Sequence, residues 1–599
     1  MVTDSKDSQL NPATLLTPWA ERIDPNNLLN EYPRPQMRRD SYLNLNGYWS
    51  FAITQSKVCH SYENKILVPF SPESALSGVQ RFAKPNEFLH YHRKVTLPNH
   101  FLKDRLIIHF GAVDQIAELF INDQFAGSHT GGFTAFCFDI TDFLKEGEID
   151  IKLVVQDTSN TSYHQTGKQR IKRGGIWYTP QSGIWQTVWL ESLPKAHIKD
   201  IRLTALYHEQ SVKIDIDRST AGAVSVEAHL NGVIQGTARA DGNTIILPLK
   251  ELRPWTPETP HLYDLTIKFN DDIIYSYFGM RHFEMRKDTG GRQQFYLNGS
   301  PYFQNGVLDQ GYYPGGLLTP PSDEAMVYDI ELMKQMGFNM LRKHIKIEPL
   351  RWYYHCDRLG MLVWQDMING GERKDIFFHG ILGIANIHLK DHRYRLFGRK
   401  NAGGRRQFEA ELNEMLVHLK NTVSISTWVP FNEAWGQFDA YRIADAVAKT
   451  DSTRLIDHAS GWSDQKTGHY HSRHIYFTKI RFRQRDAKKR ILALTEFGGY
   501  SLPIKGHLFD AGKIFGYKVF KSKEDYQKAV IDLYQKQILP QIKKGLNILV
   551  YTQLSDVEDE VNGFVTYDRK VVKIDIEAMR AINDELRREF QASQHNESK

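Results

Sequence analysis

The sequence predicts a chain of several domains in which two β-sandwiches precede a (β/α)8 barrel. Its 599 residues are too many for one hydrophobic core and correspond to roughly three to four domains of the usual size. The first half consists of short β-rich runs with turn residues between them, which is typical of sandwiches. In the second half, short apolar runs alternate with amphipathic helical stretches, which indicates a parallel sheet covered by helices.

Residues 1–194 form the first predicted sandwich. Runs such as RLIIHF from Arg105 and EIDIKLVVQD from Glu148 cluster or alternate their apolar residues and show no helical period. Between two further runs, Asn122 and Asp123 are followed by Gln-Phe-Ala-Gly, which predicts a hairpin. The polar start of the chain is expected to be frayed.

Residues 195–285 form the second predicted sandwich, which is of the immunoglobulin-like type. Its strand-like runs follow one another at the spacing expected for such a small domain. A proline-rich stretch, residues 253–260, fixes an extended edge or turn between the last two runs. The four runs begin at Val212, Val224, Asn243 and Leu262.

Residues 286–590 form the predicted (β/α)8 barrel, and residues 591–599 are expected to be a flexible tail. Amphipathic stretches separate several of the candidate strands; in residues 322–337, Ser322 is a plausible N-cap for a helix. The eight candidate strands begin at Pro301, Phe338, Gly360, Val423, Thr453, Arg473, Arg490 and Leu546.

Two glutamates lie where a barrel places catalytic groups, at the C-terminal ends of strands. Glu433 closes the fourth candidate strand and Glu496 the seventh. Either glutamate alone could be a surface residue at a strand end, but glycoside hydrolysis needs two carboxyl groups, a proton donor and a nucleophile or stabiliser. A barrel can bring such a pair to the ~5 to 5.5 Å separation of a retaining enzyme. Other strand-end candidates are Arg342, His344, Asp366, Tyr476 and Gln553.

The segments around both glutamates resemble known motifs. VPFNEAWG around Glu433 and ALTEFGG around Glu496 resemble the strand-four and strand-seven motifs of glycoside hydrolase family 2, which contains β-galactosidases, β-glucuronidases and β-mannosidases. The resemblance implies that Glu433 is the acid/base, that Glu496 is the nucleophile and that Asn432 hydrogen-bonds the sugar 2-hydroxyl. It implies no cofactor and no metal ion.

The resemblance extends over nearly the whole chain. LNLNGYW, GGFTAFCFDIT and SGIWQTVWLE look like the N-terminal sugar-binding-like domain of that family, which implies that the first sandwich is a jelly roll. PWTPETPHLYDL with FGMRHFE looks like the end of its immunoglobulin-like domain, and FYLNGSPYFQNGV like the start of its barrel. The order of these segments agrees with the order in the family.

Further residues carry over from the resemblance. Arg342 matches an arginine that can hold the nucleophile carboxylate ionised and in position. Tyr476 lies where a tyrosine hydrogen-bonds the nucleophile, although it could also be a core aromatic, and His474 is expected to line the same pocket. The family pattern has two residues between the arginine and a sugar-binding histidine, whereas only Lys343 precedes His344 here, so a sugar contact and a structural role for His344 both stay open.

The pocket residues leave the identity of the sugar open. Trp435 is expected to line the subsite, because an apolar sugar face packs on an indole. Residues 308–310 read Leu-Asp-Gln where the galactosidases and glucuronidases usually show an asparagine and a histidine, and the eighth strand lacks the tryptophan-rich pattern of the galactosidases. Asp309 and Gln553 are therefore candidate substrate-binding residues that differ from the residues found there in the familiar family members. No clear Asn-x-Lys site for a glucuronide carboxylate is present.

These observations predict a retaining exo-acting glycosidase that cleaves terminal β-linked sugars, β-galactosidase-like in type, by double displacement. Burial and ionised Glu496 are expected to raise the pKa of Glu433, and Arg342 to lower the pKa of Glu496. A β-glucuronidase or another family 2 specificity is the alternative. A carbohydrate-binding protein without hydrolysis is the alternative from another class, and a transglycosylase would share the same residues.

The resemblance implies a carbohydrate substrate as the partner, and the composition indicates neither nucleic acid nor a membrane. The net charge of +6 gives no case for nucleic acid, and no apolar run has the ~20 residues of a membrane span or forms a signal peptide. Three scattered cysteines without a CxxC pair fit a reducing, cytoplasmic compartment. His469 and His471 form only a weak metal pattern. Exposed sandwich edges make a homodimer an expectation.

Overall fold

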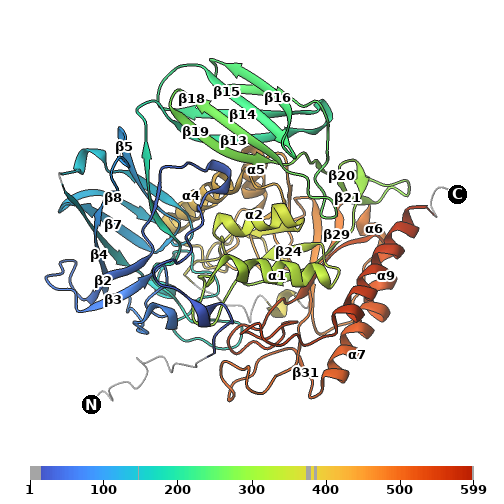
Figure 1. Cartoon of the computed structure of the whole chain (residues 1–599). Helices are drawn as coiled ribbons and strands as arrows, with labels where there is room; N and C mark the ends of the chain where they lie inside the picture. The colour runs from blue at the N-terminus through green and yellow to red at the C-terminus, as the bar shows by residue number, and fades with distance from the viewer. Residues whose placement is uncertain (1–14, 146, 373–379, 384–386, 596–599) are drawn as a thin grey trace, which may run out of the picture.

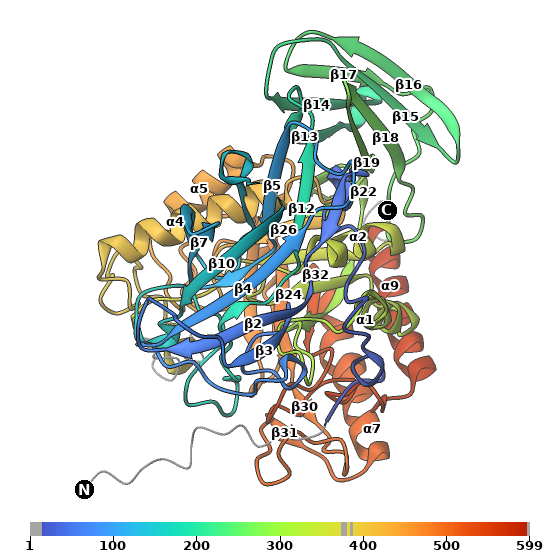
Figure 2. The ribbon, with the colours of Figure 1, turned by 60° about the vertical axis from the view of Figure 1, so that its left-hand side comes forward.

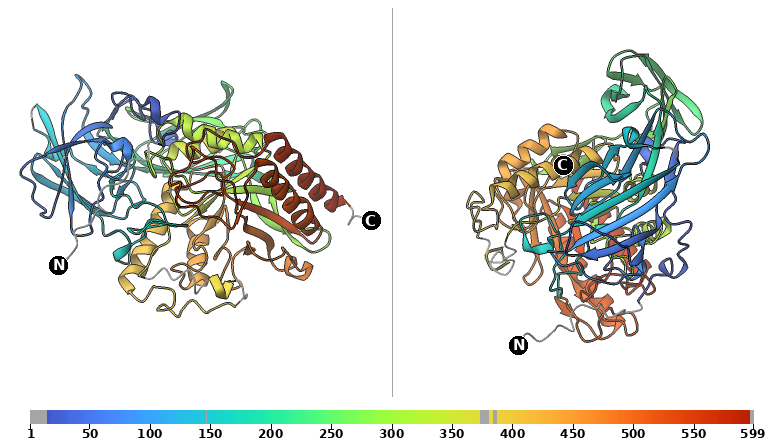
Figure 3. Two further views of the ribbon diagram at one scale, coloured as in Figure 1. Left: turned by 90° about the horizontal axis from the view of Figure 1, so that it is seen from below. Right: turned by 90° about the vertical axis from the view of Figure 1, so that its left-hand side faces the viewer.

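The computed structural model describes residues 15–145, 147–372, 380–383 and 387–595 (Figure 1). Two β-sandwiches and a barrel follow one another along the chain, as the sequence predicts. Figure 3 shows that the N-terminal sandwich and the C-terminal helix lie on opposite sides of the barrel. Among the described residues, no helix has both the length and the apolar composition that a membrane crossing requires.

The N-terminal sandwich packs a sheet of six strands against a sheet of four (Figure 2). The hairpin predicted at Asn122 and Asp123 is confirmed, and both residues have positive φ angles (50° and 67°), as a two-residue turn of the favoured hand requires. The larger sheet contains, in spatial order, β3 (Asn64–Val68), β2 (Gly47–Thr54), β4 (Phe88–Thr96), β10 (Glu148–Gln156), β7 (Ile116–Ile121) and β8 (Gln124–Thr130). The smaller contains β1 (Tyr42–Asn44), β12 (Val188–Leu193), β5 (Arg105–Phe110) and β9 (Phe136–Asp139), and β6 (Val113–Asp114) pairs separately with β11 (Gly183–Ile184).

The second sandwich lies at the top of Figure 1 and packs three strands against four. Its strands alternate buried and exposed residues, so one face of each sheet forms the core. Trp255, within the proline-rich stretch, is fully buried and donates its indole N–H to the carbonyl of Asp357 in the barrel (2.7 Å). The strands are β13 (Ile198–Leu206), β14 (Ser211–Arg218), β17 (Thr244–Pro248), β16 (Val233–Ala240), β15 (Val224–Leu230), β18 (Tyr263–Phe269) and β19 (Asp272–Phe278).

All eight predicted barrel strands are present and parallel. The fifth is shorter than expected, because the chain after Ile456 leaves the strand and brings Ser460 into backbone hydrogen bonds with Phe431 and Glu433. The backbone N–H of His469, just before the sixth strand, donates to the carbonyl of Ile456 in the fifth (2.9 Å). This bond connects the two end strands of the sheet. In spatial order the strands are β27 (Leu455–Ile456), β26 (Ile425–Val429), β25 (Leu362–Asp366), β24 (Met340–Lys343), β23 (Gln304–Asp309), β32 (Leu546–Thr552), β29 (Ile491–Gly498) and β28 (Tyr470–Ile475).

Helices and a small sheet surround these strands. Ser322 caps the first helix, since its side chain accepts the N–H of Ala325 (3.3 Å), as predicted. The last helix continues to His595, so residues 591–595 are not the flexible tail that the sequence suggested, and residues 596–599 lie outside the described residues. The helices are α1 (Asp323–Gln335), α2 (Leu350–Leu359), α4 (Ala402–Leu419), α5 (Ala440–Thr450), α6 (Gln484–Ala487), α7 (Lys523–Leu533), α8 (Leu539–Ile542) and α9 (Ile576–His595). The small sheet before the barrel contains β20 (Phe283–Lys287), β21 (Gln293–Leu297) and β22 (Ser300–Pro301), and β30 (Tyr500–Ser501) pairs with β31 (Lys518–Val519).

The N-terminal sandwich reaches the mouth of the barrel through the segment that follows β10. The backbone N–H groups of Thr166 and Gly167 both donate to the carbonyl of Asn369, in the loop after β25 (3.0 and 2.9 Å). Gly167 has a φ of +57°, and a Cβ atom there would lie 3.1 Å from the carbonyl oxygen of Ile345. This close approach therefore favours glycine, and it places part of the first domain over the C-terminal strand ends.

A buried ion pair joins the two sandwiches. Arg39 donates two hydrogen bonds to the carboxylate of Asp272 in β19 (2.8 and 2.9 Å) and lies 3.4 Å from Glu191 in β12. Both Arg39 and Asp272 are almost completely buried. The second sandwich is thus held to the first by charge as well as by the chain connection.

Removing one partner of this pair should destabilise the protein. Asp272→Ala leaves Arg39 buried with less compensating charge, so we expect the free energy of unfolding to fall by ~3–5 kcal/mol. Urea denaturation followed by circular dichroism measures the loss. Asp271→Ala, at the neighbouring exposed position, is the control and should change it by less than ~0.5 kcal/mol. Equal losses in the two variants would show that the ion pair does not hold the sandwiches together.

Candidate active site

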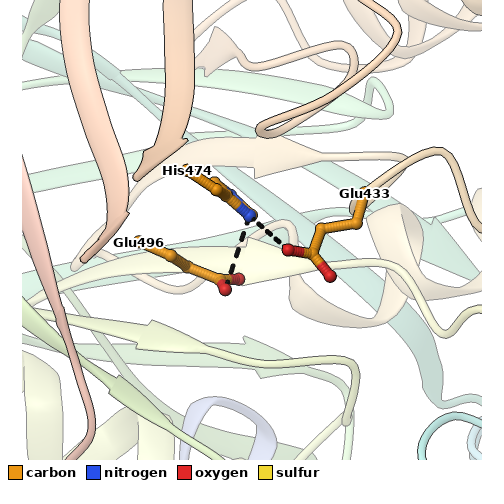
Figure 4. Close-up of side chains that lie close together, drawn as sticks. All are labelled: Glu433, His474 and Glu496. Carbon is orange, nitrogen blue, oxygen red and sulfur yellow. Dashed lines mark hydrogen bonds and ion pairs between the residues drawn. The ribbon is translucent and has the colours of Figure 1, made fainter. Parts of the chain in front are cut away.

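Glu433 and Glu496 meet at the C-terminal end of the barrel. His474, in β28, lies between them, with its Nδ1 atom 2.8 Å from Oε1 of Glu433 and 3.4 Å from Oε2 of Glu496 (Figure 4). One oxygen from each glutamate and one ring nitrogen of His474 all lie within 4.8 Å of one another. This spacing suits a retaining carboxyl pair, whose groups lie ~5 to 5.5 Å apart.

The turn after β26 presents Glu433 to the site. Glu433 and the following Ala434 both have positive φ angles (48° and 61°), which non-glycine residues rarely adopt. A backbone hydrogen bond from Glu433 to the carbonyl of Ser460 (2.9 Å) holds this conformation. Such strain is characteristic of functional sites, and it is invisible in the sequence because the segment contains ordinary residues at these positions.

Both oxygens of the Glu496 carboxylate have a partner. Arg342 approaches Oε1 with its guanidinium (3.3 Å), and the Tyr476 hydroxyl donates to Oε2 (2.6 Å). The Tyr476 hydroxyl also lies 2.8 Å from the hydroxyl of Thr552. The contacts expected for Arg342 and Tyr476 are therefore confirmed, and Tyr476 is more than an aromatic that fills the core.

Arg342 connects four strands of the barrel. Its guanidinium donates two hydrogen bonds to Asp366 at the end of β25 (2.9 and 3.0 Å) and one to Oδ1 of Asn432 (2.8 Å). Because Arg342 binds the side-chain oxygen of Asn432, the side-chain nitrogen of Asn432 faces away from Arg342. That buried nitrogen has no hydrogen-bond partner among the described residues, so it is a donor available to a ligand hydroxyl.

His344 belongs to the same group. Its Nδ1 atom lies 2.8 Å from Oδ2 of Asp366. Burial holds the pKa of His344 well below its usual range, and the charges of Lys168 and Arg342 lower it further, so the ring is neutral near pH 7. The structure thus brings His344 to the site despite the shortened spacing after Arg342.

Trp435 and Gln553 differ in whether their polar atoms have hydrogen-bond partners. The ring of Trp435 packs against Trp177 of the first domain (5.1 Å between centroids), and its buried indole nitrogen has no partner among the described residues. Gln553 is fully buried; its Oε1 accepts from Gln310 (2.8 Å) and its Nε2 donates to Asn562 (2.7 Å). Gln553 therefore fixes neighbouring loops, whereas Trp435 offers a polar atom as well as a ring.

The structure does not bring Asp309 to this group, which corrects the expectation that it binds substrate. Its carboxylate accepts a hydrogen bond from Lys343 (2.6 Å), and Lys343 also donates to Glu348 (2.7 Å) above the ring of Trp352 (4.2 Å). Neighbouring side chains of a strand point to opposite faces. Arg342 therefore points into the barrel, while Lys343 and its partner Asp309 lie toward the surrounding helices.

The two glutamates differ in their electrostatic surroundings. Burial raises the pKa of Glu433 to about 7, partly offset by Lys168 and Arg342, and the like charge of Glu560 raises it further. Burial and the like charge of Glu433 raise the pKa of Glu496, although His474, Arg342 and Tyr476 favour its ionised form. Arg342 lowers the pKa of Glu496, as expected, but burial outweighs the cation, so the pKa stays above its usual value.

His474 stays neutral between the carboxyl groups, since burial lowers its pKa to about 4. Glu433, His474 and Glu496 are the group of three among the described residues whose atoms could together hold a metal ion. His469 and His471 form no such site there, and Nδ1 of His469 accepts the N–H of Ile456 (2.9 Å).

Two charged groups near the pair were not predicted. Lys168 comes from the first domain, and Glu560 from the loop after β32, where its Oε2 accepts the hydroxyl of Tyr178 (2.5 Å). Both influence the pKa of Glu433. No strand-end pattern marks them, because one belongs to another domain and the other to a long loop.

Comparisons with known families agree with this architecture. Three domain models match along the chain: the sugar binding domain of glycosyl hydrolases family 2 over residues 74–194, a second domain of glycosyl hydrolases family 2 over residues 196–281, and the family 2 TIM barrel domain over residues 292–573. The chain belongs to glycosyl hydrolase family 2.

Its relatives carry several names. It is similar to a β-galactosidase of Thermoanaerobacter pseudethanolicus (25% identity; 61% of this chain and 47% of that protein) and to a putative β-glucuronidase of Formosa agariphila (28%; 43% and 32%). The chain thus spans less than half the length of these curated relatives. Among solved structures, a β-glucuronidase of an uncultured Clostridium sp. has a TM-score of 0.72 (18% identity; 92% of this chain, 99% of that one), and a β-galacturonidase of Eisenbergiella tayi 0.67 (17%; 94% and 98%). At these identities the structures show a shared fold.

Arg342 should contribute strongly to stability. Arg342→Met leaves Asp366 without its buried partner, and we expect the free energy of unfolding to fall by ~3–5 kcal/mol. Arg442→Met is the control, because Arg442 pairs with Glu409 at the surface and exposed pairs contribute less than ~1 kcal/mol. Denaturant unfolding of both variants decides the matter: similar losses would contradict the role of Arg342 as the central contact.

Proposed function

We propose that the protein is a retaining exo-acting glycosidase that cleaves terminal β-linked sugars. The observation that carries the proposal is the pair of buried carboxyl groups, Glu433 and Glu496, on either side of His474. Glu433 has a pKa of about 7 and can start protonated. Glu496 is held by Arg342 and Tyr476, which favour its ionised form. One group can therefore donate a proton while the other attacks.

In the first step, Oε of Glu496 attacks the anomeric carbon and the glycosidic C–O bond breaks. The proton of Glu433 moves to the leaving oxygen, so the aglycone departs as an alcohol and the sugar becomes an ester of Glu496. In the second step, Glu433 takes a proton from water, whose oxygen attacks the anomeric carbon and releases Glu496. Two inversions retain the configuration, and both carboxyl groups return to their starting states.

The surrounding residues have distinct parts in this scheme. Arg342 and Tyr476 position the Glu496 carboxylate and stabilise it as a leaving group in the second step. Asn432 offers its free amide N–H to the sugar 2-hydroxyl, a contact that strengthens in the transition state. His344 and Trp435 line the sugar, and neutral His474 orients Glu433 without competing for its proton.

The sugar that the protein cleaves is proposed from among the specificities of the family. Relatives named β-galactosidase and putative β-glucuronidase support a terminal hexose or hexuronide. A cytoplasmic location is part of the proposal and is supported by the three free cysteines. A panel of nitrophenyl galactosides, glucuronides, mannosides, glucosides, fucosides and arabinosides tests activity and sugar together. Binding without release of nitrophenol from any member would favour a carbohydrate-binding protein instead.

Azide should distinguish the two glutamates. Glu496→Ala is expected to lower kcat on an aryl glycoside by ~10⁴-fold or more, and azide should restore turnover by giving the glycosyl azide of inverted configuration. Glu433→Ala should lower it by ~10²- to 10⁴-fold, and azide should give the azide of retained configuration. Nuclear magnetic resonance of the products reads the configuration. Glu524→Ala, at an exposed position of α7, is the control; full activity of Glu496→Ala would exclude the nucleophile role.

The pH dependence should follow the two carboxyl groups. Because Glu433 must be protonated, kcat/KM is expected to fall as the pH rises through its pKa of about 7. Because Glu496 must be ionised and its pKa is raised, activity should also fall on the acid side at a higher pH than for an ordinary glutamate. Glu433→Gln, assayed on a substrate with a good leaving group, should lose the alkaline limb. An alkaline limb that persists in Glu433→Gln would assign it to another residue.

A further inference from the structure

We propose that Lys168, which the N-terminal sandwich contributes to the barrel mouth, binds an anionic group of the substrate. The inference rests on the proposed function and deepens it, because it assigns a substrate class: glycosides whose sugar in the site carries a carboxylate or a sulfate ester. Three observations carry it, namely the fixed position of the Lys168 loop, a largely buried side chain whose ammonium group forms no ion pair among the described residues, and its place beside the candidate site.

The loop that carries Lys168 is held on both sides. The backbone N–H groups of the two preceding residues donate to the carbonyl of Asn369, and the Asn369 side chain donates to the carbonyl of Asn432 (3.2 Å). On its other side, the carbonyl of Lys168 accepts the N–H of Tyr178 (3.0 Å). These bonds connect the Lys168 backbone to the strand end that carries Glu433. The position of the Lys168 backbone relative to Glu433 is therefore fixed by hydrogen bonds.

Lys168 differs from the other buried lysines. Lys343, Lys346 and Lys573 each have a carboxylate oxygen within 2.8 Å. Lys168 is only 8% exposed, yet within the described part of the chain no carboxylate forms an ion pair with it; its ammonium nitrogen lies over the ring of Tyr178, 5.6 Å from the centroid. An ammonium group without a counter-ion has its hydrogen-bond donors available to a ligand anion.

The ammonium group acts on the candidate catalytic residues. Burial raises the pKa of Glu433 and lowers the pKa of His344, and after burial Lys168 has the largest influence on both. It also lowers the pKa of His474. Its ammonium nitrogen lies over the ring of Tyr178 (5.6 Å to the centroid), and the hydroxyl of Tyr178 donates to Glu560, so Lys168 lies on the side of the site where Glu560 is found.

The other charges at the mouth explain why an anion would need Lys168. Glu496 and Glu560 make the mouth negative, and the guanidinium of Arg342 is already occupied by Asp366, Glu496 and Asn432. A sugar with a negative group would be repelled unless a free cation faces it. Lys168 is a cation of the site without an ion-pair partner among the described residues, and it can donate three hydrogen bonds.

A simpler role, in which Lys168 only tunes Glu433, makes a different prediction. Loss of the positive charge would then raise the pKa of Glu433 and move the alkaline limb upward for every substrate alike. Loss of an anion contact would instead raise KM for anionic substrates and leave neutral ones unchanged at their pH optimum. The ratio of kcat/KM between anionic and neutral glycosides therefore separates the two roles.

The experiment compares Lys168→Met and Lys168→Arg with the control Lys172→Met, an exposed lysine of the same loop. Each is assayed on nitrophenyl β-glucuronide, β-galacturonide and 6-sulfated β-galactoside, and on the neutral β-glucoside and β-galactoside. Calorimetry measures the binding of free glucuronate, galacturonate, galactose 6-sulfate, glucose and galactose. The uronate and sulfate arms identify the source of the anion. Circular dichroism checks that the variants fold.

We expect the wild-type protein to favour an anionic ligand over its neutral counterpart, and Lys168→Met to lose about 10- to 100-fold of that preference. Lys168→Arg should keep part of it and Lys172→Met all of it. Cleavage of neutral glycosides without a preference, or equal losses on both classes, would overturn the inference and leave the proposed function intact. Lys168-dependent binding of an anionic sugar without any hydrolysis would support the inference and overturn the proposed function.

Discussion

The candidate site depends on the hydrogen bonds and ion pairs that the guanidinium of Arg342 forms. It lies at the centre of the barrel mouth and joins groups from β24, β25, β29 and the turn after β26. A planar fork with five donors can bind two carboxylates and an amide at once, which an ammonium group cannot. The position of Glu496, the orientation of Asn432 and the charge of Asp366 all follow from this one residue.

Burial sets the chemistry of the pair that Arg342 organises. It raises the pKa of both glutamates, and the difference between them comes from their neighbours. Glu496 has two hydrogen-bond donors that favour its charged form, whereas the carboxyl group of Glu433 has the neutral ring of His474 as its hydrogen-bond partner among the described residues. A barrel mouth open to water would weaken this contrast, because solvent screens charges that are not buried.

The N-terminal sandwich provides much of that burial. Its loop around Gly167 docks on Asn369, and Trp177 packs on Trp435 at the rim. The first domain is therefore part of the site, and Arg39 with Asp272 connects it to the second sandwich in turn. A catalytic barrel separated from the first domain would lose Lys168 and one wall of the pocket, although its eight strands could still form.

The sequence by itself determined the domain order, the eight barrel strands and the two glutamates. These follow from local patterns, since strand periodicity and polar strand ends are written in contiguous residues. It also indicated Arg342, Tyr476 and Asn432 through family motifs. It failed at Asp309, because a shift of one residue along a strand reverses the side chain from the barrel interior to the helices.

Only the tertiary structure decided which side chains meet and what charge each carries. The left-handed turn at Glu433, the place of His474 between the glutamates and the arrival of Lys168 from another domain depend on segments far apart in the chain. The pKa of a carboxyl group depends on its burial and its neighbours, and neither is a property of the local sequence. For that reason the two glutamates could be predicted from motifs, whereas the charges that surround them required the folded molecule.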